Sequence, residues 1–226
     1  MEKNDKSVSL PTLKRLPKYY SIACQALDKG RKYISSKDIA KKLDINDSQV
    51  RKDFAAIKHY GRGKLGFELV ELKKYLEEFL GFNEQKDAFL IGAGNLGIAL
   101  AKYDNFERYG LNILALFDNN PQKEGISVGG KQIFHISKFP NLAYRMNVSL
   151  AILTVPEHSA QKVADFIVMS GIKYIWNFTS VTLNVPDDVE VWNEDLAASF
   201  ATFSRFMSSK NPSINKFPAE KVLCNI

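Results

Sequence analysis

The stretch FLIGAGNLGIALA (residues 89–101) decides the fold of the larger part of this chain. An apolar run leads into Gly92, Gly94 and Gly97, which have the spacing GxGxxG, and the residues that follow are typical of a helix. In such a loop the first glycine allows a tight turn and the second lets the backbone approach a pyrophosphate. The third lets the helix pack closely on the strand. The stretch therefore predicts a dinucleotide-binding loop.

An acidic residue stands where such a loop needs one. Asp118, in FDNNP, follows Gly97 by 21 residues, at the end of the next apolar run. An acid about 20 residues beyond the loop accepts hydrogen bonds from the adenosine ribose. Its charge would also repel a 2′-phosphate, so the sequence favours NAD over NADP. The alternative is a simple turn residue at the start of DNNP.

After residue 83 the chain alternates apolar runs with helical stretches. Strands are expected at 88–91, 113–117, 149–155 and 173–178, and helices at 95–104, 137–145 and 159–170. This alternation indicates βαβ units and a parallel sheet. The expected fold class of this part is α/β, of the Rossmann type.

The first 80 residues have a different pattern. Helices are expected at 12–29, 35–43, 48–59 and 70–81, with a short glycine-rich hairpin at 61–69. The first helix should become regular only near Leu16, because Pro17 is tolerated in a first turn. A helix, a short turn and a second helix before a hairpin are typical of a winged helix-turn-helix domain.

Charge is divided unevenly between these two parts. Residues 1–80 hold 18 Lys and Arg against 11 Asp and Glu, whereas residues 81–226 hold 13 against 14. The basic excess lies entirely in the N-terminal part, which favours an acidic partner for it. A solvated basic surface is the alternative.

Several classes of protein are disfavoured. No run reaches the ~20 apolar residues of a membrane span, and no leader pattern is present, so a cytoplasmic protein is expected. Cys24 and Cys224 are far apart and predict reduced thiols. His59, His135 and His158 lack ligand-like spacing, so no metal site is expected.

A bound dinucleotide could be a reagent or a signal. A dehydrogenase needs a positioned acid–base group and a substrate pocket. The one late histidine near a strand end, His158, is better explained as a helix-start residue, and no separate substrate domain follows the sheet. These features favour a sensor with no catalytic residues. The alternatives are a small NAD-dependent oxidoreductase with a helical dimerisation domain, and a CoA- or nucleotide-binding scaffold.

Motifs in both parts point the same way. They are RLPKYY (15–20), SSKDIA (35–40), QVRKDF (49–54), IGAGNLG (91–97), FDNNP (117–121), AILTVP (151–156), GIKYIWNF (171–178) and EDLA (194–197). Together they resemble the Rex family of redox-sensing transcriptional repressors over about residues 12–206. The resemblance implies a homodimer that binds operator DNA with NAD+ or without ligand and releases it with NADH. It also implies that a C-terminal helix, here 195–207, swaps into the partner subunit.

The resemblance implies the roles of individual residues. The NAD(H) site would consist of Gly92, Ala93, Gly94, Asn95, Leu96, Gly97, Asp118, Thr154, Val155, Pro156, Asn177, Phe178, Tyr103 and Asp195. The residues for DNA would be Ser48, Gln49, Arg51 and Lys52 on the recognition helix, followed by Lys58, Arg62 and Lys64.

The chain departs from the family at three places. Ser21 replaces an arginine that in the family pairs with the acid of the swapped helix. AAIK (55–58) replaces SYFG, and the basic glycine pattern of the wing is shifted to 61–64. These changes bear on the coupling of the domains and on which operator is bound.

The expected organisation has four parts. A winged-helix domain at 1–82 precedes a Rossmann domain at 83–193, a swapped helix at 194–210 and a tail at 211–226. Phe200, Phe203 and Phe206 form an apolar stripe late in the chain, for which a partner subunit is the expected cover. Packing on the chain's own sheet is the alternative.

Overall fold

The computed structural model describes residues 8–210, and its contacts divide the chain into two compact units. Unit 1 contains the chain up to Lys86 together with Asp104–Leu111. Unit 2 contains Asp87–Tyr103 and, within the described residues, the chain from Asn112 to Lys210. The tail predicted at 211–226 lies outside the described residues.

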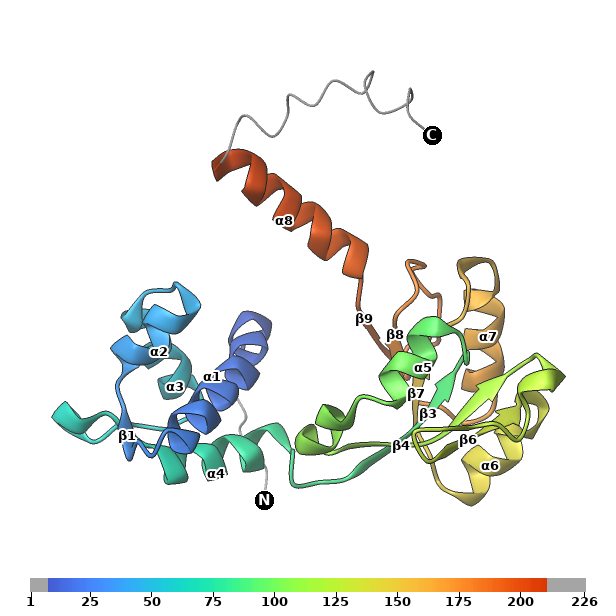
Figure 1. Ribbon diagram of the computed structural model, residues 1–226, viewed down its shortest axis with the longest axis horizontal. Helices are drawn as coiled ribbons and strands as arrows, with labels where there is room; N and C mark the ends of the chain where they lie inside the picture. The colour runs from blue at the N-terminus through green and yellow to red at the C-terminus, as the bar shows by residue number, and fades with distance from the viewer. Residues whose placement is uncertain (1–7, 211–226) are drawn as a thin grey trace, which may run out of the picture. The chain divides into compact units, whose positions relative to one another are not determined.

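Unit 1 is a small helical domain with one short sheet (Figure 1). Its elements are α1 (Leu10–Asp28), β1 (Tyr33–Ile34), α2 (Ser36–Leu43), α3 (Asp47–Ala56), β2 (Phe67–Glu68) and α4 (Leu69–Leu80). The helices enclose a core that includes Leu16, Phe54 and Leu72, all essentially inaccessible to solvent. The architecture is the predicted helix-turn-helix with a wing.

Two local signals set the helix-turn-helix. Ser35 caps α2 through a capping box, because its Oγ accepts from the Asp38 N–H at 3.1 Å and the Asp38 carboxylate accepts from the Ser35 N–H at 3.3 Å. Asp44, in the left-handed region at φ 53°, ends α2. Asn46 then caps α3 by accepting from the Ser48 N–H at 2.9 Å. Both helix starts follow from the sequence.

The expected limits of two helices are wrong. The helix α1 begins at Leu10, with Pro11 in its first turn, and it runs through Pro17. Leu16 and Ala23 are fully buried on either side of the proline, and this packing outweighs the one backbone hydrogen bond that Pro17 cannot donate. The helix α3 ends at Ala56 instead of residue 59, so Lys58 lies beyond it at φ 58°.

The wing is shorter than a full hairpin. A 3₁₀ turn at Gly63–Leu65 is closed by an antiparallel bridge between Arg62 and Gly66. The strand β2 pairs with β1, which lies before α2 in the sequence. The wing is thus tied to the start of the helix-turn-helix.

Unit 2 is built on a seven-stranded sheet with the order β5-β6-β4-β3-β7-β8-β9. The strands are β3 (Lys86–Ile91), β4 (Leu111–Asp118), β5 (Ser127–Val128), β6 (Lys131–His135), β7 (Leu150–Leu153), β8 (Tyr174–Asn177) and β9 (Glu190–Asn193). The pairs β4–β6, β3–β7, β7–β8 and β8–β9 are parallel, and the edge strand β5 pairs antiparallel with β6. Each expected strand is present, whereas β5, β6 and β9 were not predicted.

Helices cover both faces of this sheet. They are α5 (Asn95–Ala101), α6 (Phe139–Arg145) and α7 (Glu157–Met169) (Figure 1). The core under α6 and α7 contains Phe89, Phe117 and Phe139, whose rings meet edge to face. On the other face Gly97 of α5 lies close to Leu90. Alternate residues of β3 thus point to opposite helix layers, which is the expected α/β arrangement.

The helix α8 (Leu196–Lys210) follows β9. Its apolar residues Leu196, Phe200, Phe203 and Phe206 are 65, 62, 54 and 53% exposed. Within residues 8–210, none of the helices is both long enough and apolar enough to cross a bilayer.

Candidate functional site

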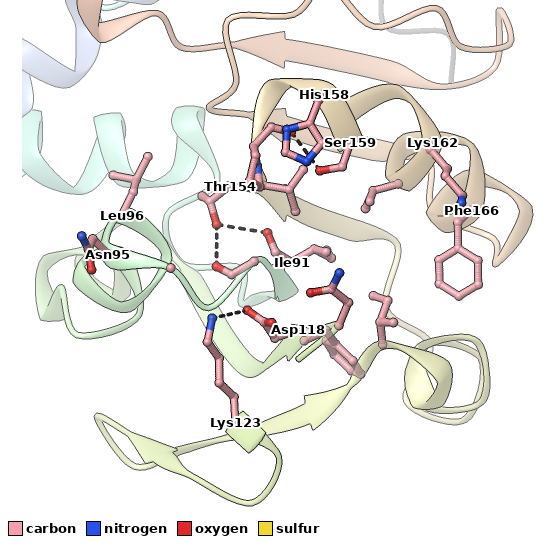
Figure 2. A pocket seen from close by; sticks show the side chains of 18 of the residues that line it. Ile91, Asn95, Leu96, Asp118, Lys123, Thr154, His158, Ser159, Lys162 and Phe166 are labelled. Carbon is pink, nitrogen blue, oxygen red and sulfur yellow. Dashed lines mark hydrogen bonds and ion pairs between the residues drawn. The ribbon is translucent and has the colours of Figure 1, made fainter. Parts of the chain in front are cut away.

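A pocket of about 930 Å³ lies at the carboxyl ends of β3, β4 and β7 in unit 2 (Figure 2). The strand β3 has β4 on one side and β7 on the other, so the sheet changes its winding direction here. Open α/β sheets bind ligands at such switch points. The lining residues are Ile91, Gly92, Gly94, Asn95, Leu96, Phe117, Asp118, Asn119, Lys123, Ile136, Ser137, Thr154, Val155, Pro156, His158, Ser159, Lys162, Val163 and Phe166.

The glycine-rich loop forms one side of the pocket. Gly92 has φ +101°, and a Cβ there would lie 2.7 Å from the Thr154 carbonyl oxygen. A Cβ at Gly97 would lie 1.9 Å from the carbonyl oxygen of Gly92. At Gly94 nothing lies within 4 Å of a Cβ position, so its backbone is open to the pocket. The loop thus has a positive φ at Gly92, an open backbone at Gly94 and close packing at Gly97, which is the geometry that a pyrophosphate-binding loop requires.

Thr154 fastens the loop to the neighbouring strand. Its hydroxyl oxygen lies 3.0 Å from the Ile91 carbonyl oxygen and 2.8 Å from that of Gly92, and its single proton is shared between them (Figure 2). The Thr154 N–H also donates to the Ile91 carbonyl at 2.9 Å. These bonds hold the loop against the start of the β7–α7 connection.

Asp118 lies at the end of β4 and is 8% exposed. Its carboxylate accepts hydrogen bonds from the backbone N–H groups of Ala93 and Asn120, each at 2.9 Å, and from Lys123 Nζ at 2.8 Å. Burial alone would raise the pKa of Asp118, but these donors outweigh burial and hold the pKa below its usual value. The carboxylate is therefore charged at neutral pH, as recognition of a ribose diol requires.

Lys123 was not predicted, although it follows Asp118 by only five residues. A 3₁₀ turn at Pro121–Lys123, capped by Asn120, folds the chain back toward the loop. The ammonium then donates to the Ala93 carbonyl at 3.0 Å as well as to Asp118, the bond drawn in Figure 2. Lys123 links the glycine-rich loop to β4. The turn signal DNNP could have indicated this return.

The far end of the pocket comes from α7 and was also missed. Ser159, Lys162, Val163 and Phe166 line it, at the three- and four-residue spacing of one helix face (Figure 2). Apolar and cationic side chains together suit a flat base with phosphates nearby. His158 lines the pocket too, at the start of α7.

The other residues of the predicted site fall into two groups. Asn95, Leu96, Val155 and Pro156 line the pocket. Ala93 is buried beneath the loop, and four further predicted residues are outside the lining set: Tyr103, Asn177, Phe178 and Asp195.

Asn177 is fully buried, and its amide organises the loop after β8. It donates to the Val181 carbonyl and to Asn193 Oδ1, and it accepts from the N–H and the hydroxyl of Thr179. Asp195 is exposed and accepts from the Ala198 N–H, which makes it a cap of α8. The structure thus gives both residues a role in shaping the chain around the site.

Unit 1 presents the basic residues predicted for DNA. Lys52 and Lys58 are exposed. Arg51 is half exposed and pairs with Asp47 one turn earlier, with Nη1 2.5 Å from the carboxylate. Arg62 lies 3.0 Å from each of two acids, Glu68 and Glu71. Both arginines are therefore already paired with carboxylates of unit 1.

Three further residues are predicted to bind DNA: Ser48, Gln49 and Lys64. The amide of Gln49 donates to Asp53 Oδ1 at 2.9 Å, so it faces the body of unit 1. Ser48 lies in the first turn of α3 and its N–H is bound by the Asn46 cap. The side chain of Lys64 lies outside the described part of the chain.

The inner side of α3 carries a buried carboxylate that sequence reasoning missed. Asp53 is 1% exposed and accepts from Arg15 Nε at 2.6 Å, Arg15 Nη2 at 2.7 Å and the Tyr19 hydroxyl at 2.5 Å. Thr12 and Gln49 also donate to it. Burial would raise the pKa of Asp53, but the hydrogen bonds from Arg15, Tyr19 and Gln49 keep it below the usual value. The network joins α1 to the helix predicted to read DNA.

Within residues 8–210 no group of three or more His, Cys, Asp or Glu side chains is arranged to hold a metal ion. The pocket instead combines an open glycine-rich backbone, a charged carboxylate and cations, which fits a dinucleotide.

Comparison with known proteins covers both units. A family model described as "Putative DNA-binding protein N-terminus" matches residues 7–55, and one described as "CoA binding domain" matches residues 83–181. A "Redox-sensing transcriptional repressor Rex" of Bacteroides fragilis is 40% identical over 199 residues, covering 88% of this chain and 90% of that protein. The protein of the same name from Treponema denticola is 39% identical over 200 residues, covering 88% and 95%.

Solved structures give the same result. RSP, described as a Rex-family repressor, has been solved in complex with β-NAD+ and operator DNA, with a TM-score of 0.84 and 33% identity to this chain. That match covers 93% of this chain and 97% of RSP. RSP in complex with β-NADH has a TM-score of 0.83, with 92% and 98% covered.

Proposed function

Since the chain belongs to the Rex family of redox-sensing transcriptional repressors, we propose that unit 1 binds operator DNA and that unit 2 binds NAD(H) as a signal. NAD+ or the empty site permits operator binding, and NADH releases the operator. The chain then reports the ratio of NADH to NAD+ in the cell.

One observation carries this proposal. A single chain combines a helix-turn-helix whose α3 has exposed cations with a switch-point pocket that holds the glycine-rich loop against Asp118. Neither feature alone identifies a sensor. Together they supply a ligand site and an output, and coupling between the two is what a sensor needs.

The proposed site consists of the glycine-rich loop, the residues along the adjoining pocket wall and four residues outside the pocket lining. Gly92, Gly94 and Gly97 hold the pyrophosphate, with Ala93, Asn95 and Leu96 between them, and Asp118 binds the adenosine ribose. Thr154, Val155 and Pro156 line the adjoining wall, as their place in the pocket supports. Tyr103, Asn177, Phe178 and Asp195 belong to the nicotinamide end, which the partner subunit completes.

NADH should be preferred over NAD+. The oxidised nicotinamide carries a positive charge and the reduced ring does not, so an apolar surrounding favours the reduced form. Phe178 and the apolar face of α8 supply that surrounding, with Phe200, Phe203 and Phe206 across the homodimer interface. The preference then makes NADH the releasing ligand.

Release requires that NADH favour a different arrangement of the dimer from the one that binds DNA. A ligand shifts such an equilibrium only by its difference in affinity for the two states, typically about 1–3 kcal/mol. Operator DNA must weaken NADH binding by the same factor. The proposal assigns no catalytic residue, and it locates the protein in the cytoplasm, where it meets DNA and NAD(H).

The decisive experiment measures operator binding against both forms of the ligand. Operators are selected from a random duplex pool with the NAD+-loaded protein and then used in fluorescence anisotropy titrations. We expect NADH to weaken operator binding by about 5–150-fold and NAD+ to have little effect. An operator affinity that is identical in saturating NADH and NAD+ would contradict the redox-sensing function.

A CoA-binding scaffold is the second candidate, because the model that matches residues 83–181 has that description. It leaves unit 1 without a role, whereas the Rex relatives span both units. A rise in melting temperature with CoA but not with NADH would favour it. Turnover of alcohols or hydroxy acids with NAD+ would instead favour the oxidoreductase.

A further inference from the structure

The segment Asp104–Leu111, here called the strap, belongs by its contacts to unit 1. In sequence it lies inside unit 2, between α5 and β4, and its residues 104–109 form a 3₁₀ helix. The chain therefore leaves unit 2 after Tyr103, packs in the DNA-binding unit, and returns at Asn112. A direct connection between α5 and β4 would not need to pack in unit 1.

An aromatic triangle anchors the strap. The Tyr109 ring lies 4.9 Å from the Phe82 ring at 87° and 6.1 Å from the Tyr20 ring at 66°, measured between ring centroids. The third side, between Tyr20 and Phe82, measures 5.2 Å at 73°. All three contacts are edge to face, the arrangement that aromatic pairs prefer. The strap is thus fixed at Tyr109 to both α1 and the end of α4.

The backbone next to this triangle is fixed as well. The Lys86 N–H donates to the Gly110 carbonyl at 2.6 Å. Gly110 has φ +76°, and a Cβ there would lie 2.5 Å from the Glu84 carbonyl oxygen and 2.8 Å from that of Phe82. Only glycine allows the backbone at position 110 to lie so close to these two carbonyl oxygens, so the position of the strap in unit 1 is well defined here.

The N-terminal end of the strap follows α5, the helix that begins at the glycine-rich loop. The first residues of α5, Asn95 and Leu96, line the pocket. The last turn of α5 continues through the Lys102 and Tyr103 N–H groups, which donate to Ile98 and Leu100. A helix of this length spans about 10 Å, and its hydrogen bonds make it move as one piece. Only Lys102 and Tyr103 separate the end of α5 from the strap.

Within unit 1 a series of side-chain contacts joins the aromatic triangle to α3. Tyr20 precedes Ser21 on α1, and its hydroxyl donates to Glu77 of α4 at 2.8 Å. Its neighbour Tyr19, with Arg15, holds the buried Asp53 of α3. The helix α1 therefore contacts the strap through Tyr20 and the recognition helix through Tyr19.

We propose that the strap carries the state of the dinucleotide loop to α1 and from there to α3, with Tyr109 as its positioning residue. The proposal rests on the proposed function, since it names the route by which NADH changes operator binding. Tyr109 is not among the residues that line the pocket, nor among those predicted to bind DNA. Its contribution is to the coupling between the two sites and not to the affinity of either one.

The test compares Tyr109→Ala, Tyr109→Phe and the wild-type protein. For each, operator affinity is measured with and without saturating NADH, and NADH affinity is measured without DNA. We expect Tyr109→Ala to reduce the NADH effect on operator affinity at least fivefold, within the usual range of coupling energies, because the variant removes the contacts of the strap with Tyr20 and Phe82. Each separate affinity should change less than about twofold, because Tyr109 is outside the pocket lining. Tyr109→Phe keeps the ring and should retain the wild-type effect.

Tyr144→Ala is the matched control, because it removes a tyrosine of unit 2 that is 87% exposed. It should behave as the wild type. If Tyr109→Ala retains the full NADH effect on operator binding, the strap is not the route and the proposal is overturned.

Hydrogen exchange separates failure of the strap from failure of the proposed function. On addition of NADH we expect amide exchange to change in residues 104–111 and in α1 of the wild type, and to stay unchanged in α1 of Tyr109→Ala. If NADH binds but operator affinity does not respond, the proposed function fails, and exchange still tests the strap. If bound NADH leaves amide exchange in residues 104–111 and in α1 unchanged, the proposed role of the strap is overturned. Absence of NADH binding overturns both.

Discussion

Arg15 and Asp53, which are 38 residues apart in sequence, form an ion pair in which guanidinium Nε and Nη2 lie 2.6 and 2.7 Å from the two carboxylate oxygens. The carboxylate is 1% exposed, and the guanidinium side chain is 24% exposed. The pair joins the first helix of the chain to the inner side of α3. The orientation of the predicted recognition helix therefore depends on residues on its buried side.

Asp53→Ala should lower the free energy of unfolding of the protein by about 3 kcal/mol, because it leaves the buried end of Arg15 without its partner. It should also weaken operator binding, since α3 loses its attachment to α1. Urea denaturation followed by circular dichroism measures the first effect and anisotropy the second. Asp28→Ala, which removes an exposed carboxylate at the end of α1, is the control and should change neither.

The ion pair between Arg15 and Asp53 also predicts that the free energy of unfolding depends on pH. The pKa of Asp53 is lowered in the folded protein, so its stabilisation is complete above the unfolded value of about 4 and is lost as the pH falls through the folded value. The free energy of unfolding should therefore fall more steeply below pH 4 in the wild type than in Asp53→Asn. Urea titrations between pH 7 and pH 3 measure the difference. Parallel curves would show that Asp53 does not contribute to acid sensitivity.

Local patterns predicted much of the fold. The helical periodicity of residues 35–43 and 48–59 placed α2 and α3, and the apolar runs placed β3, β4, β7 and β8. Each of these signals lies within a few residues of the element that it sets. The glycine spacing and Asp118 located the pocket for the same reason, because one βαβ unit contains both.

What the sequence did not predict depends on contacts between distant residues. Whether Pro17 starts or interrupts α1 is decided by the core on which Leu16 packs. The strands β6 and β9 mix polar and apolar residues and are defined by their partners β4 and β8. Asp53 has the polarity of a surface residue, and only the fold brings Arg15 to it. Such features have no local signal.

Arg51→Ala and Lys52→Ala should each weaken operator binding. The loss should be about 1–3 kcal/mol for a residue that contacts a base, or a reduction of the salt dependence by about one charge for a residue that contacts phosphate. Arg51 is already paired with Asp47, so its contribution is reduced by the loss of that pair. Anisotropy at several salt concentrations distinguishes the two kinds of contact. Lys74→Ala, an exposed lysine of α4, is the control. Unchanged affinity in both variants would contradict the assignment of α3 as the recognition helix.

Asp118→Ala should weaken NADH and NAD+ binding while leaving operator binding intact and insensitive to NADH. The change removes the acceptor for the ribose and also the partner of Lys123. The unpaired Lys123 should then favour a 2′-phosphate, so the preference for NADH over NADPH should shrink. Calorimetric titration with both dinucleotides measures this. Asp187→Ala, in an exposed loop before β9, serves as the control. A wild-type preference in Asp118→Ala would show that selectivity arises elsewhere in the pocket.

A chain that ends at residue 193 should be monomeric and should bind NADH weakly. Phe200, Phe203 and Phe206 are 62, 54 and 53% exposed on α8, and a single soluble chain rarely leaves so large an apolar surface uncovered. A partner subunit covers it if α8 swaps, and the same helix then completes the nicotinamide end of the partner's pocket. Analytical ultracentrifugation measures the oligomeric state, and NADH fluorescence measures binding. Phe200→Ser with Phe203→Ser in the full chain separates loss of the apolar stripe from loss of the helix. A truncated chain that stays dimeric with unchanged NADH affinity would exclude the swapped helix, because neither the interface nor the pocket would then need α8.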